Sequence, residues 1–320
     1  MEEEKNGSLG RFCVRTDLAL EESEAFEARS GEKSGIYLRE QSNPAEEIKL
    51  TRVTILNERG EQALGKPMGE YLTIEANRLA QTDEEYHNSV SLEFARQLRR
   101  MIEEVLGNVG NGVLVVGLGN ASITPDSLGP RVVGNLCMTR HLPKKERAGS
   151  LTLSGIVPGV MAQTGMEAAE LLRGVVEQTK PGVVVVIDAL AARSVHRLGT
   201  TIQLTNTGIC PGSGVGNHRE GLTKERLGVP VIAVGVPTVI GVAAIVQDTV
   251  NALTETLARS EVTRRAGEWM ETLDEEGQYH LISELLEPKF SSLYVTPPDI
   301  DETIRRLSFT ISEGIHTAIA

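Results

Sequence analysis

Two aspartates follow apolar runs of the kind that form buried strands. Asp126 lies in the glycine-containing segment 117–130, GLGNASITPDSLGP, which comes directly after the run VLVV. Asp188 ends the run VVVVID. In open parallel sheets, ligands and catalytic groups gather at the carboxyl ends of the strands. We therefore expect both carboxylates to reach one crevice at the edge of a sheet.

Two carboxyl groups in one crevice can do acid and base chemistry. Close carboxylates cannot both ionise cheaply, so the pKa of one rises and the pair can hold a proton between them. One member can then activate a water molecule while the other protonates a leaving amine, as in aspartic peptidases. Asp126 also has a simpler interpretation, because TPD is a common helix entrance and its carboxylate can cap the helix that follows. Asp188 is harder to explain as solvated surface, because its strand delivers it to the sheet edge.

A phosphate site is the first alternative for the glycine turn. GLGNAS supplies two glycines of the dinucleotide-binding fingerprint, but Ser122 stands where the third glycine is needed. No acidic residue closes a short second strand about 20 residues later, as that fingerprint requires. Nucleotide binding is therefore the weaker hypothesis.

The second glycine-rich loop, residues 207–220, raises two more alternatives. It contains Cys210 and His218, which could form a thiol nucleophile and its base, although no third, orienting residue is evident. His196 and His218 could instead join the two aspartates as metal ligands, but no HxxxH or CxxC spacing supports such a set. We assign neither a metal ligand nor a cofactor.

Composition limits the class of protein. The chain has 320 residues, with 44 acidic against 32 basic side chains and a net charge of −12, which would repel a phosphate backbone and argues against nucleic-acid binding. Its longest apolar runs are interrupted by Asp, Pro and Gly, whereas a membrane-spanning helix needs about 20 apolar residues. The N-terminus has neither region of a secretory signal. Three widely spaced cysteines fit a reducing compartment, so we expect a cytoplasmic protein without a membrane partner.

The elements that must position the aspartates follow from the apolar pattern. Between residues 112 and 241, short apolar runs alternate with helical segments, which indicates a parallel sheet covered on both faces. A helix is expected over residues 83–106, capped by Thr82 or Asp83, and residues 35–80 and 242–320 are expected to add peripheral strands and helices. The prediction is one α/β domain with three layers, α/β/α, around a mostly parallel twisted sheet. The first thirty residues look like an extended, accessible arm.

Four long strings together resemble the germination proteases, atypical aspartic endopeptidases that degrade small acid-soluble spore proteins when a spore germinates. The strings are GLGNASITPDSLGP, VVVVIDALAARS, TIQLTNTGICPGSGVGNHRE and VPVIAVGVPTVI, and the N-terminal VRTDLALE also matches. The resemblance implies that Asp126 and Asp188 are the catalytic pair and that the fold is similar to that of the hydrogenase maturation endopeptidases. It also implies a homotetramer in the cytoplasm of the forespore and in the spore core.

The resemblance also implies a zymogen that removes its own propeptide. Substrates of the family are cut within Thr-Glu-(Phe/Ile)-Ala-Ser-Glu, after the first acidic residue, and residues 16–21 read TDLALE. We therefore predict self-cleavage between Asp17 and Leu18, which divides the chain into a propeptide arm, 1–17, and an endopeptidase domain, 18–320. Without the resemblance, TDLALE would be interpreted as a helix start capped by Thr16.

A cut after an acidic residue implies a cation in the substrate pocket. Arg131 and Arg193 lie near the aspartates in the sequence and are the candidates, although either could pair with a surface carboxylate instead. Two other classes stay open. One is a metal-dependent maturation endopeptidase, for which no matching histidine is evident, and the other is a non-enzymatic nucleotide-binding module.

Overall fold

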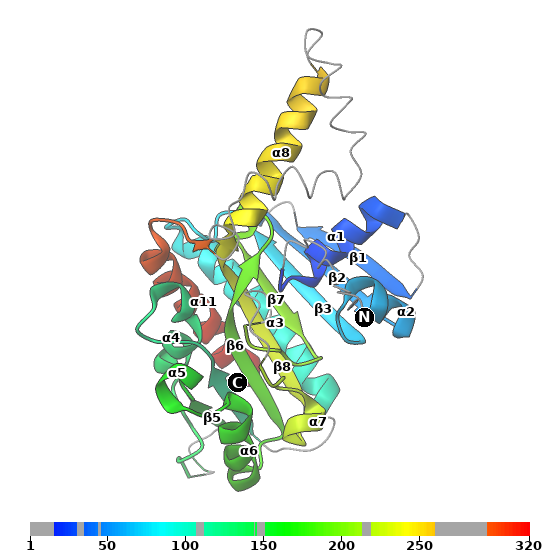
Figure 1. Cartoon of the computed structure of the whole chain (residues 1–320). Helices are drawn as coiled ribbons and strands as arrows, with labels where there is room; N and C mark the ends of the chain where they lie inside the picture. The colour runs from blue at the N-terminus through cyan, green and yellow to red at the C-terminus, as the bar shows by residue number, and fades with distance from the viewer. Residues whose placement is uncertain are drawn as a thin grey trace, which may run out of the picture.

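The strands of the protein form one mixed sheet (Figure 1). The computed structural model describes residues 16–30, 35–43, 46–106, 112–143, 145, 151–212, 219–259 and 293–320. The order across the sheet is β1-β2-β3-β7-β8-β6-β4-β5, and β9 pairs with β8. The strands are β1 (Ile36–Asn43), β2 (Ile48–Ile55), β3 (Gly69–Ala76), β4 (Val113–Gly117), β5 (Leu153–Ile156), β6 (Val183–Ala192), β7 (Thr201–Thr205), β8 (Val231–Gly241) and β9 (Tyr294–Val295).

The part of the sheet that carries the two aspartates is parallel. β4 pairs in parallel with β5 and β6, and β6 pairs in parallel with β8. The remaining strands, from β7 outward to β1, are antiparallel. Residues 193–200 join β6 to β7, and this connection is too short for the crossover that a parallel neighbour needs, so β7 returns antiparallel. The predicted α/β fold is confirmed, but the sheet is mixed rather than mostly parallel, because three of the eight strand pairings among the described residues are parallel and five are antiparallel.

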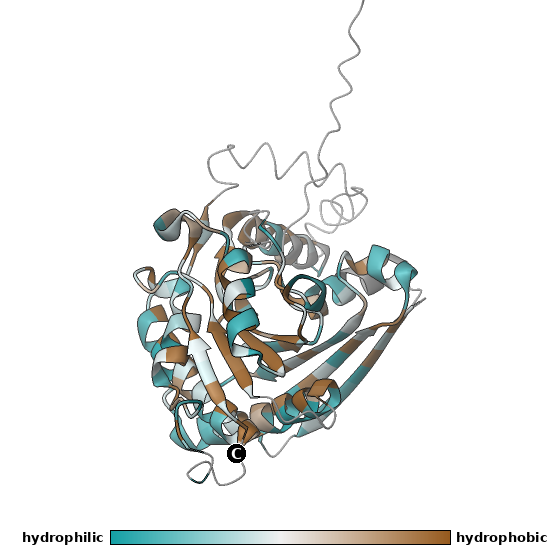
Figure 2. Ribbon diagram, turned by 90° about the horizontal axis from the view of Figure 1, so that it is seen from below, coloured by the Kyte–Doolittle hydropathy of each residue, from teal (hydrophilic) through white to brown (hydrophobic). Residues whose placement is uncertain are grey.

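Helices cover both faces of the sheet. α3 (Glu84–Leu106), α4 (Leu128–Asn135) and α11 (Ile300–Ile319) pack on one face, in the larger apolar core. α6 (Ala168–Thr179) and α7 (Lys224–Leu227) pack on the other face, and α1 (Ala19–Ser30) and α2 (Glu58–Leu64) cover the antiparallel strands. Two further helices are α5 (Met161–Thr164) and α8 (Val242–Arg259), and α8 projects away from the sheet in Figure 1. Apolar residues gather on the strands between the helices (Figure 2).

The long helix expected over residues 83–106 is present as α3. Its first turn is capped as predicted, because the N–H of Tyr86 donates a hydrogen bond to Oδ1 of Asp83 at 3.0 Å. Among the residues that the structure describes, no helix has the length and apolarity needed to cross a membrane.

The expectation of an extended, accessible arm is wrong for residues 16–30. This segment enters α1 at Ala19, and Leu18 and Ala19 are both 0% exposed. Their apolar side chains supply the reason, since burying them against the sheet is more favourable than leaving them in water. The beginning of the arm, residues 1–15, lies outside the described part of the chain.

Candidate active site

Asp126 is held at the end of β4 by a loop that folds back on itself. The N–H of Asn120 donates to Oδ2 of Asp126 at 2.8 Å, and the N–H of Asp126 donates to the carbonyl oxygen of Ile123 at 2.9 Å. Gly119 has a φ of +108°, and a Cβ there would lie 2.0 Å from the carbonyl oxygen of Asp126. The loop therefore needs glycine at this position to bring a carboxylate over the sheet edge.

Burial raises the pKa of Asp126, while the hydrogen bond from Asn120 and the charge of Arg219 act in the opposite direction. Both opposing effects favour the ionised carboxylate. The structure does not support Asp126 as a helix cap. Ser127 holds the cap position of α4, and no side-chain hydrogen bond caps that helix.

Asp188 lies within β6, between β4 and β8 in the sheet. The expectation that it ends its strand is wrong, because β6 continues to Ala192 through its pairing with β8. Asp188 is buried, with 6% of its surface exposed. Its Oδ1 accepts a hydrogen bond from the N–H of Ala189 at 3.0 Å. Burial raises the pKa of Asp188 well above its usual range, and the neighbouring carboxylates of Asp17 and Asp126 raise it further. The site thus contains one carboxyl that strongly favours its proton and one that is better stabilised as an anion.

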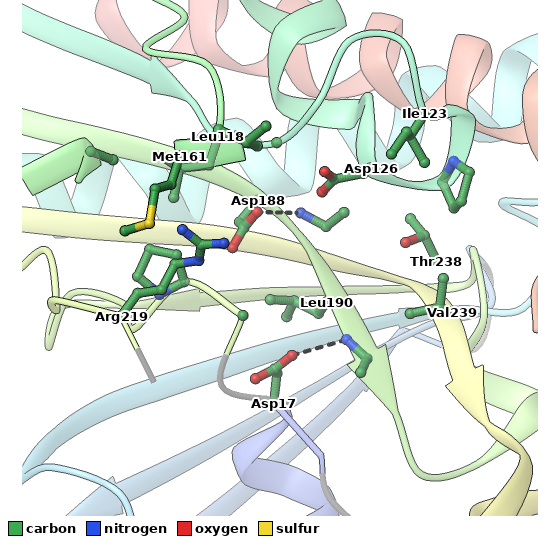
Figure 3. A pocket seen from close by; sticks show the side chains of 18 of the residues that line it. Asp17, Leu118, Ile123, Asp126, Met161, Asp188, Leu190, Arg219, Thr238 and Val239 are labelled. Carbon is green, nitrogen blue, oxygen red and sulfur yellow. Dashed lines mark hydrogen bonds between the residues drawn. The ribbon is translucent and has the colours of Figure 1, made fainter. Parts of the chain in front are cut away.

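Asp126 and Asp188 line one cavity of about 320 Å³ (Figure 3). The predicted crevice is therefore present. Asp17, Arg219 and Thr238 line the same cavity. In Figure 3 the carboxyl groups of the first two aspartates lie on one side of Leu190 and the carboxyl group of Asp17 on the other.

The N-terminal segment is fastened to β6 next to this cavity. The N–H of Asp17 donates to the carbonyl oxygen of Ala191 at 3.1 Å, and the N–H of Ala191 donates to Oδ2 of Asp17 at 2.9 Å. Leu18 is buried, and its N–H donates to the hydroxyl of Thr16 at 3.0 Å. The peptide bond predicted to be cut, Asp17–Leu18, therefore lies at the edge of the cavity that contains the two aspartates.

A second anchor holds Glu21, further along the same segment. Its carboxylate accepts hydrogen bonds from the backbone N–H groups of Arg193, at 2.8 Å, and Ser194, at 3.0 Å. It also accepts a hydrogen bond from the hydroxyl of Thr16 and forms an ion pair with Arg197 at 3.4 Å. Burial nevertheless raises the pKa of Glu21.

The two arginines chosen from the sequence do not line the cavity. Arg131 is exposed on α4, where its Nε donates to the hydroxyl of Ser127 at 3.1 Å. Arg193 lines a separate cavity with Asp248, and its backbone N–H donates a hydrogen bond to Glu21 of the N-terminal segment.

Arg219 and Thr238 are not among the site residues predicted from the sequence. Arg219 comes from the second glycine-rich loop, whose unusual backbone freedom was the available signal. Thr238 is the extra residue where the pairing between β6 and β8 shifts, and it is 1% exposed. Its Oγ1 is one of the buried side-chain oxygens that lack a hydrogen-bond partner among the described residues.

The alternatives based on cysteine and histidine receive no added support. Cys210 is exposed and lines a neighbouring cavity, His196 lines the cavity of Arg193, and His218 lies outside the described residues. Within the described ranges, no group of three or more His, Cys, Asp or Glu side chains could hold a metal ion.

Comparison with known proteins gives consistent matches. The family model described as germination protease matches residues 14–268. A germination protease from Caldanaerobacter subterraneus is 46% identical over 314 residues, which cover 96% of this chain and 94% of that protein. Germination proteases from Clostridium acetobutylicum and Bacillus mycoides are 42% and 38% identical, and the alignments cover 96% and 97% of this chain and 95% of each relative.

A solved structure, that of a NiFe hydrogenase maturation protease from Thermococcus kodakarensis, matches 67% of this chain and 98% of its own at 18% identity. Its TM-score of 0.32 is too low to carry an argument. The sequence matches, by contrast, cover almost the full length of this chain and of each relative. The chain therefore belongs to the germination protease family.

Proposed function

We propose that the protein is an aspartic-type endopeptidase that begins the degradation of small acid-soluble spore proteins during germination. The observation that carries the proposal is the common cavity of Asp126, Asp188 and Asp17. Two carboxyl groups with different electrostatic environments lie beside a segment that resembles the family's substrate. Family membership supports a protease, and the cavity supports this pair of residues as its catalytic groups.

In the proposed mechanism, Asp126 is the base and Asp188 is the acid. The ionised Asp126 takes a proton from a water molecule as the water oxygen attacks the carbonyl carbon of the scissile bond. The protonated Asp188 donates its proton to the departing nitrogen as the C–N bond breaks. The assignment rests on burial, which favours the protonated form of Asp188 most strongly, and on the hydrogen bond from Asn120 and the charge of Arg219, which favour ionised Asp126.

A cation in the cavity would favour an acidic residue before the cut, and we assign that role to Arg219. It lines the cavity with both aspartates, and its charge acts on Asp126. Arg131 and Arg193, which sequence position favoured, stay as the alternatives to be tested against it.

We further propose that the chain is a zymogen that cuts itself between Asp17 and Leu18 and assembles as a homotetramer in the forespore and spore core. Residues 1–17 would be released as the propeptide. The contacts of Asp17 with Ala191 support this processing site, because they hold the segment next to the aspartates.

The test compares Asp126→Asn and Asp188→Asn with the unaltered chain. Mass spectrometry follows the mass of the N-terminal fragment and the cleavage of a peptide that contains Thr-Glu-Phe-Ala-Ser-Glu. Loss of either group should slow both reactions by about 10²- to 10⁴-fold. Asp248→Asn is the matched control, because burial also raises the pKa of this half-buried carboxyl, which lines a different cavity.

Folded Asp126→Asn and Asp188→Asn variants that still cleave would show that the catalytic group lies elsewhere, and Cys210 would be the next residue to change. An unaltered chain that is folded but cuts neither itself nor the peptide would refute the proposed specificity.

A further inference from the structure

Gln203 and Asp188 lie on either side of one glycine in the sheet. Gln203 of β7 and Asp188 of β6 are both paired with Gly235 of β8. Directly paired residues point to the same face of a sheet, so both side chains project from the same level and the same face. Gly235 has no side chain to separate them, and the space above it is filled by Leu190, which a Cβ on Gly235 would contact at 2.3 Å.

The amide of Gln203 contacts the main chain on both sides of one peptide bond. Its Nε2 donates a hydrogen bond to the carbonyl oxygen of Asp17 at 3.3 Å. Its Oε1 accepts a hydrogen bond from the N–H of Ala19 at 2.7 Å. Two peptide bonds, Asp17–Leu18 and Leu18–Ala19, lie between these contacts, and Asp17–Leu18 is the one predicted to be cut. Gln203 itself is 6% exposed, so these bonds lie away from solvent.

The peptide segment runs along the boundary between two cavities. One contains Asp126 and Asp188, and the other contains Gln203 and Gly235. Asp17 and Leu190 line both, and Figure 3 shows Leu190 between Asp188 and Asp17. Gln203 therefore holds the segment from the side opposite to the proposed catalytic pair.

We propose that Gln203 is a substrate-binding residue of the catalytic site, which holds the peptide main chain on both sides of the bond to be cut. Its N–H binds the carbonyl oxygen that becomes negatively charged during attack, and its Oε1 binds the N–H of the second residue after the cut. A donor aimed at that oxygen stabilises the transition state more than the ground state. The inference rests on the proposed cleavage between Asp17 and Leu18.

A purely structural role for Gln203 is less able to account for its contacts. The segment already has two other anchors, at Ala191 and around Glu21. Neither of these contacts the carbonyl group of Asp17, whereas Gln203 does. Because its two contacts are with main-chain atoms, Gln203 could bind any substrate sequence in the same register.

The first experiment follows self-cleavage of three full-length variants. Gln203→Glu keeps an acceptor for the N–H of Ala19 but loses the donor to the carbonyl of Asp17, and Gln203→Leu loses both. Gln97→Leu is the matched control, because Gln97 is another nearly buried glutamine with hydrogen bonds elsewhere, to Glu93 and Arg52. We expect both Gln203 variants to process on the order of 10²-fold more slowly and the control to process at the unaltered rate. Thermal unfolding verifies that each variant is folded.

The second experiment uses each chain after processing is complete and a peptide that contains Thr-Glu-Phe-Ala-Ser-Glu. A matched peptide carries N-methylalanine, in which a methyl group replaces the N–H proposed to bind Oε1. The methyl group should reduce kcat/KM at least about tenfold for the unaltered enzyme and for Gln203→Glu, and much less for Gln203→Leu, which has no acceptor to lose. The loss of the donor should appear mainly in kcat.

The outcomes separate this inference from the proposed function. If the unaltered enzyme cuts itself and the peptide while both Gln203 variants do the same at equal rates, the role of Gln203 is refuted and the proposed function stands. An N-methyl effect of equal size in the unaltered enzyme and in Gln203→Leu would also overturn it, because the two groups would then not be in contact. If the folded, unaltered enzyme cuts neither substrate, the proposed function has failed.

Discussion

Asp17 forms hydrogen bonds through both its backbone and its side chain with one residue, Ala191, which lies on the same strand as Asp188. β6 therefore positions both the predicted processing site and one of the two proposed catalytic groups. The negative charge of Asp17 lies close enough to act on Asp188, where it is a larger influence than the charge of Asp126.

Removing the charge of Asp17 should lower the pKa of Asp188. The carboxylate of Asp17 disfavours the ionised form of Asp188, so Asp17→Asn removes part of what raises that pKa. Carbon-13 NMR titration of labelled aspartate measures the change, with Asp126→Asn present in every chain to prevent cleavage. Asp17→Glu, which retains the charge, is the control, and an equal pKa for Asp188 in all chains would contradict the prediction.

The variant Asp188→Asn should be more stable than its parent at neutral pH. Because burial raises the pKa of Asp188, the folded state retains a proton that the unfolded state, with a pKa of about 3.9, releases. Stability is therefore lost as the pH rises from about 4 through the folded-state pKa. Asparagine does not titrate, so the variant escapes this loss.

Thermal unfolding at several pH values checks the stability of Asp188→Asn, again with Asp126→Asn in both chains. The midpoint for the variant should be higher at pH 7, by a few degrees, and the difference should shrink toward pH 4. Asp301→Asn makes the same substitution at an exposed position and should not raise the midpoint. A variant that is less stable than its parent at pH 7 would show that the ionised form of Asp188 is favoured in the fold.

Replacing Arg219 with glutamine should move the acidic limb of the pH–rate profile to higher pH. Arg219 lowers the pKa of Asp126, so its loss raises that pKa, and the ionised base then becomes available only at higher pH. The profile of kcat/KM against pH reports the free enzyme and measures the shift directly.

Arg131→Gln and Arg193→Gln provide the matched comparison for Arg219→Gln. A pair of peptides with Glu or Gln before the cut shows which arginine recognises the acidic residue. We expect only Arg219→Gln to lose the preference for Glu. If Arg131→Gln or Arg193→Gln loses it instead, our assignment of the cation is wrong.

The hydroxyl of Thr238 should contribute to activity rather than to stability. It is buried at the cavity without a hydrogen-bond partner among the described residues, and an unpaired buried hydroxyl is costly. Thr238→Val should therefore raise the free energy of unfolding by about 1 kcal/mol while peptide cleavage slows. Chemical denaturation and peptide assays measure the two effects, and Thr238→Ser should keep the activity. A valine variant with both lower stability and full activity would contradict the prediction.

Local patterns made much of the parallel centre predictable. The runs around Val113–Gly117 and Val183–Ala192 are strands as expected, and the helix over residues 83–106 begins at the predicted cap. The cavity shared by Asp126 and Asp188 was expected from the rule that ligands gather where parallel strands end. Only β4 ends there, however, since β6 continues past Asp188 to Ala192. The accessible arm was predicted wrongly, because the burial of Leu18 depends on a sheet surface that the segment itself does not encode.

The strands of the parallel centre, and the two aspartates that follow its apolar runs, could be predicted from the sequence because apolar periodicity is a local property. Which distant residues accompany the aspartates depends on the folded chain. Gln203 comes to lie two strands from Asp188 through the pairing of both with Gly235, and Arg219 reaches the cavity from a loop far along the chain. Such proximity depends on strand order and register, which arise when the whole sheet assembles.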